Sequence, residues 1–244
     1  GLTPPNWLSS LSDSKRRQTQ QETWDWFVET INDIGEVDCL VINGDCIDGK
    51  GTKSGGTELI TSDLFKQVEI AKKCINQIDF NNIFFTYGTS YHCSSNGDDF
   101  EVSLAKYYNT EIKNHLWLDV NGCIFDFKHK IQSSSVFNGR GTALLKEVQW
   151  NREWSEFGNT PKSDLIVRSH VHYCSSVSDY NSYLAITTPA LQVADTKFGG
   201  RECSGTIDFG CILFTVPENY KNVNDIDVRV FTKNFETMKS KSIK

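Results

Sequence analysis

The stretch Val41-Ile42-Asn43-Gly44-Asp45-Cys46-Ile47-Asp48-Gly49 is the most informative part of the chain. The apolar run Cys39 to Ile42 ends in Gly-Asp, which is how a buried strand delivers a carboxylate to the carboxyl edge of a sheet. Far downstream, the apolar run Leu165 to Val167 leads into Ser169-His170-Val171-His172. One carboxylate and two imidazoles presented at the same sheet edge are enough to start a metal site.

Predicted helices and strands alternate through the first half of the chain, beginning with an amphipathic helix from Lys15 to Ile34. Its apolar residues recur at three- and four-residue spacing, and Gly35 is a typical helix-ending residue. The sequence Asn121-Gly122 predicts a β-hairpin. The other elements expected in this half are strands at 37–43, 83–87, 116–120 and 123–128, and helices from Ser62 or Asp63 to about 78, from Asp98 or Asp99 to 108, and from 142 to about 157.

After residue 165 the expected elements are all strands, at 165–167, 173–177, 183–187, 207–216 and 227–231. We predict that they follow one another as a meander. Alternation followed by a run of strands favours an α/β (α+β) fold, a two-layer β-sandwich flanked by helices.

Length and composition set bounds on the kind of protein. The 244 residues contain no long linker and no repeat, so we expect a single domain over 1–244. A net charge of −6 gives no global field to attract nucleic acid, and no apolar run approaches the roughly 18 residues of a membrane span. The eight cysteines form no C-x-x-C pair, which favours a reduced, cytoplasmic protein.

Four of the five histidines lie at the ends of predicted strands or in the loops that follow: His92, His129, His170 and His172. Asp45 and Asp48 occupy the same kind of position. Each one alone is most simply a polar side chain with a satisfied hydrogen bond. Their convergence on one sheet edge is what an active site on an α/β scaffold looks like, and a mixed carboxylate and imidazole set suits Mn, Fe, Zn or Ni better than Mg or Ca.

These motifs, in this order, resemble the calcineurin-like metallophosphoesterases, more narrowly the phage- and bacteria-encoded members, over about residues 36 to 175. The resemblance implies that Asp45 bridges two metal ions, that His170 binds one of them and His172 the other, and that His129 is a further ligand. It also implies a cytoplasmic location, in the host if the protein is phage-encoded.

Two departures from the family pattern matter. In place of Gly-Asn-His, the third motif reads Gly88-Thr89-Ser90-Tyr91-His92. Thr89 occupies the place of a metal-binding Asn, and His92 lies two positions late for the catalytic His that protonates the leaving group, an offset that a loop can absorb.

The family's first motif, Asp-x-His, occurs nowhere in the chain. Either a natural chain continues upstream of Gly1 and supplies it, or this is a variant with a damaged metal site. Because losing a central strand costs more than the roughly 5–15 kcal/mol that a domain has to spare, we favour the upstream segment.

The resemblance implies a metal-dependent phosphatase or phosphodiesterase with two divalent transition-metal ions and a bridging hydroxide that attacks phosphorus. Manganese is favoured, with iron, zinc and nickel as alternatives. Asp48 is either a loop cap or a residue that orients a metal ligand. The competing hypotheses are an impaired member of the fold that binds a partner, and a nuclease, which the acidic charge does not favour.

A separate candidate is Asn138-Gly139-Arg140-Gly141-Thr142, just before a predicted helix. Glycines let the backbone approach an anion, the helix start offers free N–H groups, and Arg140 adds a bidentate fork for a phosphate. The alternative is an ordinary surface turn. Neither partner protein nor oligomeric state is indicated by the sequence.

Overall fold

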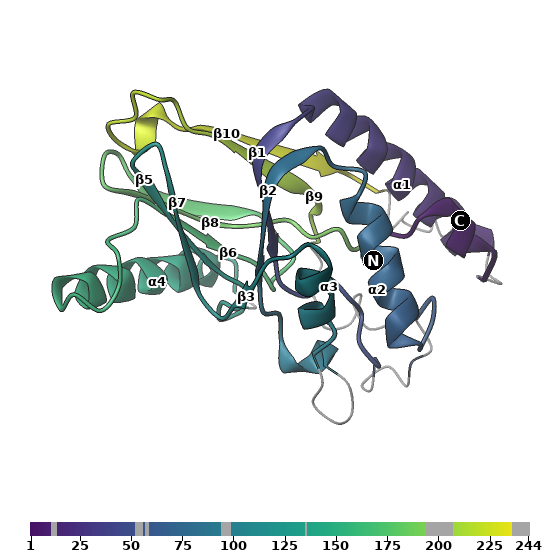
Figure 1. Ribbon diagram of the computed structural model, residues 1–244. Coiled ribbons are helices and arrows are strands. Elements are labelled where there is room, and N and C mark those ends of the chain that lie inside the picture. Colours follow the sequence, from purple (N-terminus) through teal and green to yellow (C-terminus); the bar gives the residue numbers. More distant parts are fainter. Residues whose placement is uncertain are drawn as a thin grey trace, which may run out of the picture.

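The apolar run before Gly44 forms strand β1 (Val37–Asn43) in the computed structural model, with the bounds predicted (Figure 1). The structure describes residues 1–10, 14–51, 56, 59–93, 99–134, 136–193 and 207–235. β1 pairs in parallel with β2 (Phe80–Thr86), which pairs in parallel with the short β3 (Ile112–Lys113). Within the described residues, β1 pairs with no strand along its other edge.

Helices cover one face of this small sheet. Helix α2 (Leu64–Ile75) begins at Asp63, whose side chain accepts hydrogen bonds from the N–H groups of Phe65 and Lys66, as the predicted cap requires. α2 and α3 (Glu101–Tyr107) pack onto β2 through a buried apolar cluster that includes Val68, Phe85 and Leu104. The alternative start of α3 at Asp98 lies outside the described residues.

Helix α1 (Ser14–Ile34) follows a 3-10 helix (Pro5–Ser10) and agrees with the predicted amphipathic helix. It descends along the upper right side of the molecule in Figure 1. Trp26 makes an edge contact with Phe209 of β9, at 5.3 Å between ring centroids. Gly35 ends the helix with φ of 74°, a left-handed conformation that costs glycine little.

The second sheet has five strands in the order β4-β5-β6-β8-β7. Their bounds are Leu116–Val120, Cys123–Lys128, Leu165–Arg168, Tyr183–Thr187 and Ser175–Asp179, in that spatial order. β4 and β5 form the predicted hairpin, with positive φ at Asn121 (53°) and Gly122 (87°) as a primed turn needs. β5 and β6 are parallel, and the chain crosses between them through α4 (Gly139–Glu156).

The predicted meander is wrong. β8 lies between β6 and β7, parallel to β6 and antiparallel to β7. After β6 the chain therefore forms the edge strand β7 first and then turns back to place β8 beside β6. β8 is the more apolar strand and is buried at Ala185, Ile186 and Thr187, whereas β7 is mostly polar. The apolar strand therefore takes the interior position and the polar strand takes the edge, which is how edge strands are usually protected.

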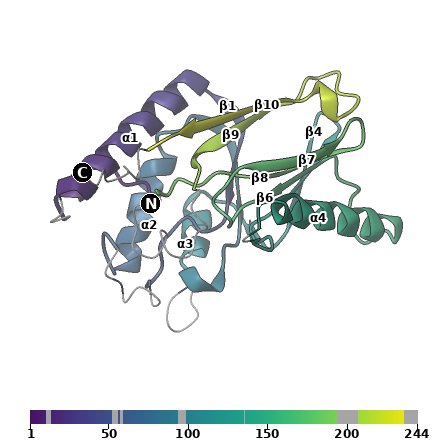
Figure 2. The same cartoon turned by 180° about the vertical axis from the view of Figure 1, so that it is seen from behind.

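The two layers meet in an apolar cluster. Phe125, Leu165 and Ile186 of the five-stranded sheet face Ile212 and Phe214 of β9 (Phe209–Thr215), which pairs antiparallel with β10 (Asp227–Lys233). Helix α4 covers the opposite face of the same sheet, as Figure 2 shows. The predicted fold class, a two-layer β-sandwich flanked by helices, is thus confirmed.

No helix in the described part of the chain is long and apolar enough to cross a membrane. The seven described cysteines are free thiols, and Cys203 lies outside the described residues.

A buried ion network stiffens the five-stranded sheet under α4. Arg168 is 1% exposed, and its guanidinium lies 2.7 Å from Asp126 Oδ1 and 2.8 Å from Glu147 Oε2. His115 Nε2 is also 2.7 Å from Asp126 Oδ1. Burial alone would raise the pKa of Asp126, but His115 and Arg168 hold that pKa below its usual value.

We expect Arg168→Met to destabilise the protein by about 3–5 kcal/mol, because it leaves the buried Asp126 carboxylate and the partly buried Glu147 carboxylate without their cation. Urea denaturation measures the change in the free energy of unfolding. Arg229→Met is the matched control, since Arg229 is 55% exposed and its pair with Asp227 spans 3.5 Å; it should cost about 0–1 kcal/mol. Equal stability losses in the two variants would contradict a structural role for the network.

Candidate metal centre

A tight turn after β1 carries Asp45 to the carboxyl edge of its sheet. Gly44 and Asp45 both have positive φ, 77° and 54°. A Cβ at Gly44 would lie 2.6 Å from His129 Nδ1 and 2.7 Å from the Cα of Gly88, so no larger residue fits there. The glycine therefore lets three loops approach one another closely enough to surround the Asp45 carboxylate.

His129 contacts that carboxylate from the end of β5. Its side chain is only 4% exposed, its Nδ1 lies 2.6 Å from the backbone oxygen of Asn43, and its Nε2 lies 2.8 Å from Asp45 Oδ2. The carbonyl can only accept, which assigns the ring proton to Nδ1 and leaves a lone pair on Nε2. Nε2 is buried and has no partner in hydrogen-bonding geometry. Two electron-rich atoms at this distance require a cation or a proton between them.

His170 completes a cluster of three ligand atoms. Its Nδ1 is 3.9 Å from Asp45 Oδ2, and its ring centroid is 5.4 Å from that of His129. One ligand atom from each of Asp45, His129 and His170 lies within 4.8 Å of the others. The sequence-distant strand ends of β1, β5 and β6 thus bring one carboxylate and two imidazoles together.

Backbone strain is concentrated at this cluster. Five described residues other than glycine have positive φ, and three of them are Asp45, His170 (71°) and His172 (58°). Such conformations cost about 1–3 kcal/mol each and persist where the surroundings enforce them, frequently at functional sites. Hydrogen bonds from Ser169 N to the His129 carbonyl (2.9 Å) and from Val171 N to the Ser169 carbonyl (2.8 Å) hold the His170 loop in this form.

The carboxylate and the imidazoles of the site shift one another's pKa values. Burial alone would raise the pKa of Asp45, but the neighbouring imidazoles of His129 and His170 and the charge of His92 hold that pKa far below its usual value. Burial lowers the pKa of His129, yet the Asp45 carboxylate outweighs burial and raises it overall. Burial, aided by the charge of His170, lowers the pKa of His172 to about 4. His172 is therefore neutral at pH 7, the form that can bind a metal.

The third motif contributes two contacts to Asp45. Thr89 donates to Asp45 Oδ1 through its N–H at 2.6 Å and through its hydroxyl at 3.2 Å. His92 Nε2 lies 3.3 Å from Asp45 Oδ2, and a short 3-10 helix (Ser90–His92) places it there despite the two-residue offset in sequence. His92 Nδ1 is buried without a hydrogen-bond partner among the described residues.

Asp48 and Arg140 lie outside the three-ligand cluster. Asp48 sits near the first residue, with its Oδ1 3.7 Å from where a Cβ of Gly1 would be. Arg140 lies in the first turn of α4, so the predicted loop at Gly139-Arg140-Gly141 is helical instead. Its guanidinium stacks 4.0 Å from the ring centroid of Tyr173, the residue after His172. We attribute the early start of α4, at Gly139, to this contact of Arg140 with the ring of Tyr173.

Two positioning residues, Glu101 and Asn43, were not predicted. Glu101 is 2% exposed and accepts hydrogen bonds from Cys46 N (2.6 Å) and Gly88 N (2.8 Å), so one carboxylate holds the loops of Asp45 and Thr89 together. Asn43 donates to Ser169 Oγ at 2.8 Å and accepts from Thr86 Oγ1 at 2.7 Å. Asn43 is the last residue of a strand that leads into Gly-Asp, a signal that could have been used; Glu101 has no distinguishing local pattern.

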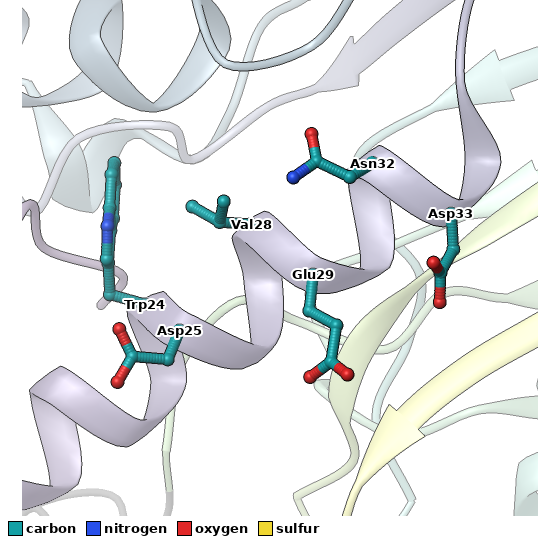
Figure 3. A pocket seen from close by; sticks show the side chains of 6 residues that line it. All are labelled: Trp24, Asp25, Val28, Glu29, Asn32 and Asp33. Carbon is teal, nitrogen blue, oxygen red and sulfur yellow. The ribbon is translucent and has the colours of Figure 1, made fainter.

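A hollow with a volume of about 480 Å³ lies elsewhere, along α1. Figure 3 shows Trp24, Val28 and Asn32 on one side of the helix and Asp25, Glu29 and Asp33 on the other. A single helix lines this hollow, and none of the candidate ligands borders it.

Comparisons with known proteins give structural similarity without sequence similarity. No protein-family model and no curated sequence matches the chain. Similar solved structures include an archaeal phosphodiesterase, at 13% identity and a TM-score of 0.47 over 84% of this chain and 88% of that one. Another is wild-type Vps29 from Entamoeba histolytica complexed with Zn²⁺, at 8% identity and a TM-score of 0.44 over 84% of this chain and 87% of that one.

A third similar structure is a Streptococcus pneumoniae protein described as a predicted phosphoesterase, at 12% identity and a TM-score of 0.31 over 85% of this chain and 90% of that one. At these values the likeness carries no information about function, which is therefore inferred from the geometry of the site.

We expect Glu101→Gln to weaken metal binding at the Asp45 cluster by about tenfold or more, a change of about 1.4 kcal/mol. The N–H groups of Cys46 and Gly88 each donate to one carboxylate oxygen of Glu101. Glutamine has only one side-chain oxygen, so one of the two loops loses its hydrogen bond. Calorimetric titration with Zn²⁺ measures the affinity. Glu69→Gln, with its side chain 56% exposed on α2, is the control and should bind as tightly as the unmodified protein. Unchanged affinity in Glu101→Gln would show that the two loops need no common anchor.

Proposed function

We propose that this protein is a metal-dependent phosphoesterase, a phosphatase or phosphodiesterase that works with two divalent transition-metal ions. The observation that carries the proposal is the cluster of one carboxylate and two imidazoles, Asp45, His129 and His170, within 4.8 Å at one sheet edge. The order of the motifs along the chain resembles the metallophosphoesterases and supports the same conclusion.

The donors present fit a divalent ion. His129 Nε2 is a buried atom without a hydrogen-bond partner that faces a carboxylate oxygen at 2.8 Å, an arrangement that a cation would stabilise. The Nδ1–H of the same ring is held by a backbone carbonyl, as in most histidines that bind metals. Imidazole and carboxylate ligands suit Mn, Fe, Zn or Ni, and manganese is our first choice.

Asp45, His129 and His170 would hold one ion, and Asp45 with His172 would contribute to the second. Thr89 stands where the family has a metal-binding Asn, and its hydroxyl could serve as a further oxygen ligand. Bound divalent ions supply Lewis acidity toward a phosphoryl group and neutralise charge that develops on it.

The remaining residues have roles in handling substrate and protons. His92 would donate a proton to the leaving oxygen, a task suited to an imidazole near neutral pH. Arg140, beside Tyr173, would bind phosphate oxygens with its planar fork. Asp48 would orient a ligand from the loop after β1.

One observation favours a second candidate, a protein of this fold that binds a single ion without catalysis. The Thr89 hydroxyl already donates to Asp45, 3.2 Å from Oδ1, and the second ion would have fewer protein ligands than the first. A nuclease remains the least supported candidate, because the net charge is −6.

We expect Asp45→Asn to lower the affinity for Mn²⁺ by at least tenfold, about 1.4 kcal/mol, because the amide removes the only carboxylate of the three-ligand cluster. Elemental analysis after dialysis against Mn²⁺ and calorimetric titration measure this change. Asp38→Asn, at an exposed position of the same strand, is the matched control. Equal metal content in all three proteins would rule out Asp45 as a ligand.

We expect Arg140→Ala to lower kcat/KM on an aryl phosphoester. The activation free energy that corresponds to kcat/KM should rise by roughly 1.5–3 kcal/mol, because a charge-assisted hydrogen-bond pair is lost. Arg140→Lys should recover only part of this loss, since a point charge lacks the planar fork. Metal content should stay unchanged in both variants. Wild-type kinetics in Arg140→Ala would leave Arg140 as an ordinary helix-start residue.

A further inference from the structure

A second cavity, with a volume of about 250 Å³, lies between the edge strand β4 and helix α4. We call it the tryptophan pocket and define it by Trp117, Trp150, Trp154, Thr160, Lys128 and His115. Figure 2 shows β4 and α4 at the same end of the molecule. None of the proposed metal ligands lines it.

Aromatic faces form its walls. The ring of Trp117 stacks on His115, with centroids 3.8 Å apart and planes at 28°. Trp150 and Trp154 lie one helical turn apart on α4, 55% and 48% exposed, in an edge-to-face pair. Large indoles left half in water at a cavity mouth are typical of a surface that a flat ligand covers.

Two polar atoms in the pocket lack partners. Trp117 Nε1 and Thr160 Oγ1 are both buried and have no hydrogen bond within the part of the chain that the structure describes. The indole N–H can only donate, whereas the hydroxyl can donate or accept. Buried polar groups are nearly always satisfied in folded proteins, so these two atoms are available to a ligand that offers an acceptor, such as a ring carbonyl or ring nitrogen.

The ion pairs of the lining leave one described cation without a partner. The carboxylates of Asp126 and Glu147 both pair with Arg168, at 2.7 and 2.8 Å, and His115 Nε2 lies 2.7 Å from Asp126 Oδ1. Lys128 also lines the pocket and forms no ion pair among the described residues. It is the cation available to an anionic substituent.

We propose that the tryptophan pocket binds the base of a nucleotide. The heteroaromatic ring would stack on the indoles, accept a hydrogen bond from Trp117 Nε1 and bond to Thr160 Oγ1, and its phosphate would pair with Lys128. Stacking of a base on aromatic side chains tolerates any base, so purines and pyrimidines should both bind. Binding needs no metal, and it goes beyond the proposed phosphoesterase activity.

The test is a titration of the ¹⁵N-labelled protein with each nucleoside monophosphate in EDTA, which keeps the protein free of metal. We expect saturable shifts of the Trp117 indole N–H resonance. Ribose 5-phosphate, which lacks a base, and inorganic phosphate should bind at least tenfold more weakly. Equal binding of ribose 5-phosphate, or no response to any nucleotide at millimolar concentration, would overturn the proposal.

Variants separate the contacts. Trp117→Phe keeps an aromatic ring but removes the N–H donor, and it should weaken binding at least fivefold. Trp154→Ala, which removes a stacking surface, and Thr160→Val, which removes the hydroxyl, should also weaken binding at least fivefold. Lys128→Gln should weaken nucleotides but not nucleosides. Trp24→Phe, on α1, is the control and should bind normally. Full affinity in the Trp117, Trp154 and Thr160 variants, or saturable binding of a proline-rich peptide in place of nucleotides, would contradict a base site.

Discussion

The close approach of a buried imidazole to a partly buried carboxylate is the constraint on which the site depends. His129 Nε2 lies 2.8 Å from Asp45 Oδ2 in surroundings from which water is largely excluded. Neither group is stable there alone, because burial penalises the charged form of each. The Asn43 carbonyl accepts a hydrogen bond from Nδ1 of His129, so the ring proton is on Nδ1. Nε2 of the neutral ring therefore presents a lone pair to the carboxylate. A proton or a metal cation between them would satisfy both, and the proposed metal centre rests on this arrangement.

The scaffold supplies this geometry by combining rigid strands with strained turns. β1, β5 and β6 end near one another, and the residues immediately beyond them turn into left-handed conformations at Asp45, His170 and His172. Glu101 and Asn43 stitch the turns together through hydrogen bonds of 2.6–2.8 Å. Hydrogen bonds from residues that are not proposed ligands thus offset the backbone strain at the proposed ligands.

Most of the fold follows from local pattern. β1 and the hairpin strands agree with prediction to the residue, because an apolar run with defined turn residues at its ends leaves little choice. α4 begins at Gly139, earlier than predicted, because Arg140 stacks on Tyr173 from a distant part of the chain. The position of β8 between β6 and β7 was missed for a related reason. Strand order depends on which strand is apolar enough to be buried, and that competition is not local.

The sequence by itself determined which residue types end the strands: a Gly-Asp after one apolar run, a lone histidine after another and a His-x-His pair after a third. Only the tertiary structure decided that Asp45, His129 and His170 meet, that His92 reaches Asp45 despite its offset, and that the Thr89 hydroxyl donates to the carboxylate. It also decided that a tryptophan on β4 and two on α4 enclose one cavity. The physical reason is that strand ends and helix faces are encoded by neighbouring residues, whereas the distances between them are set by how the two sheets and their helices pack.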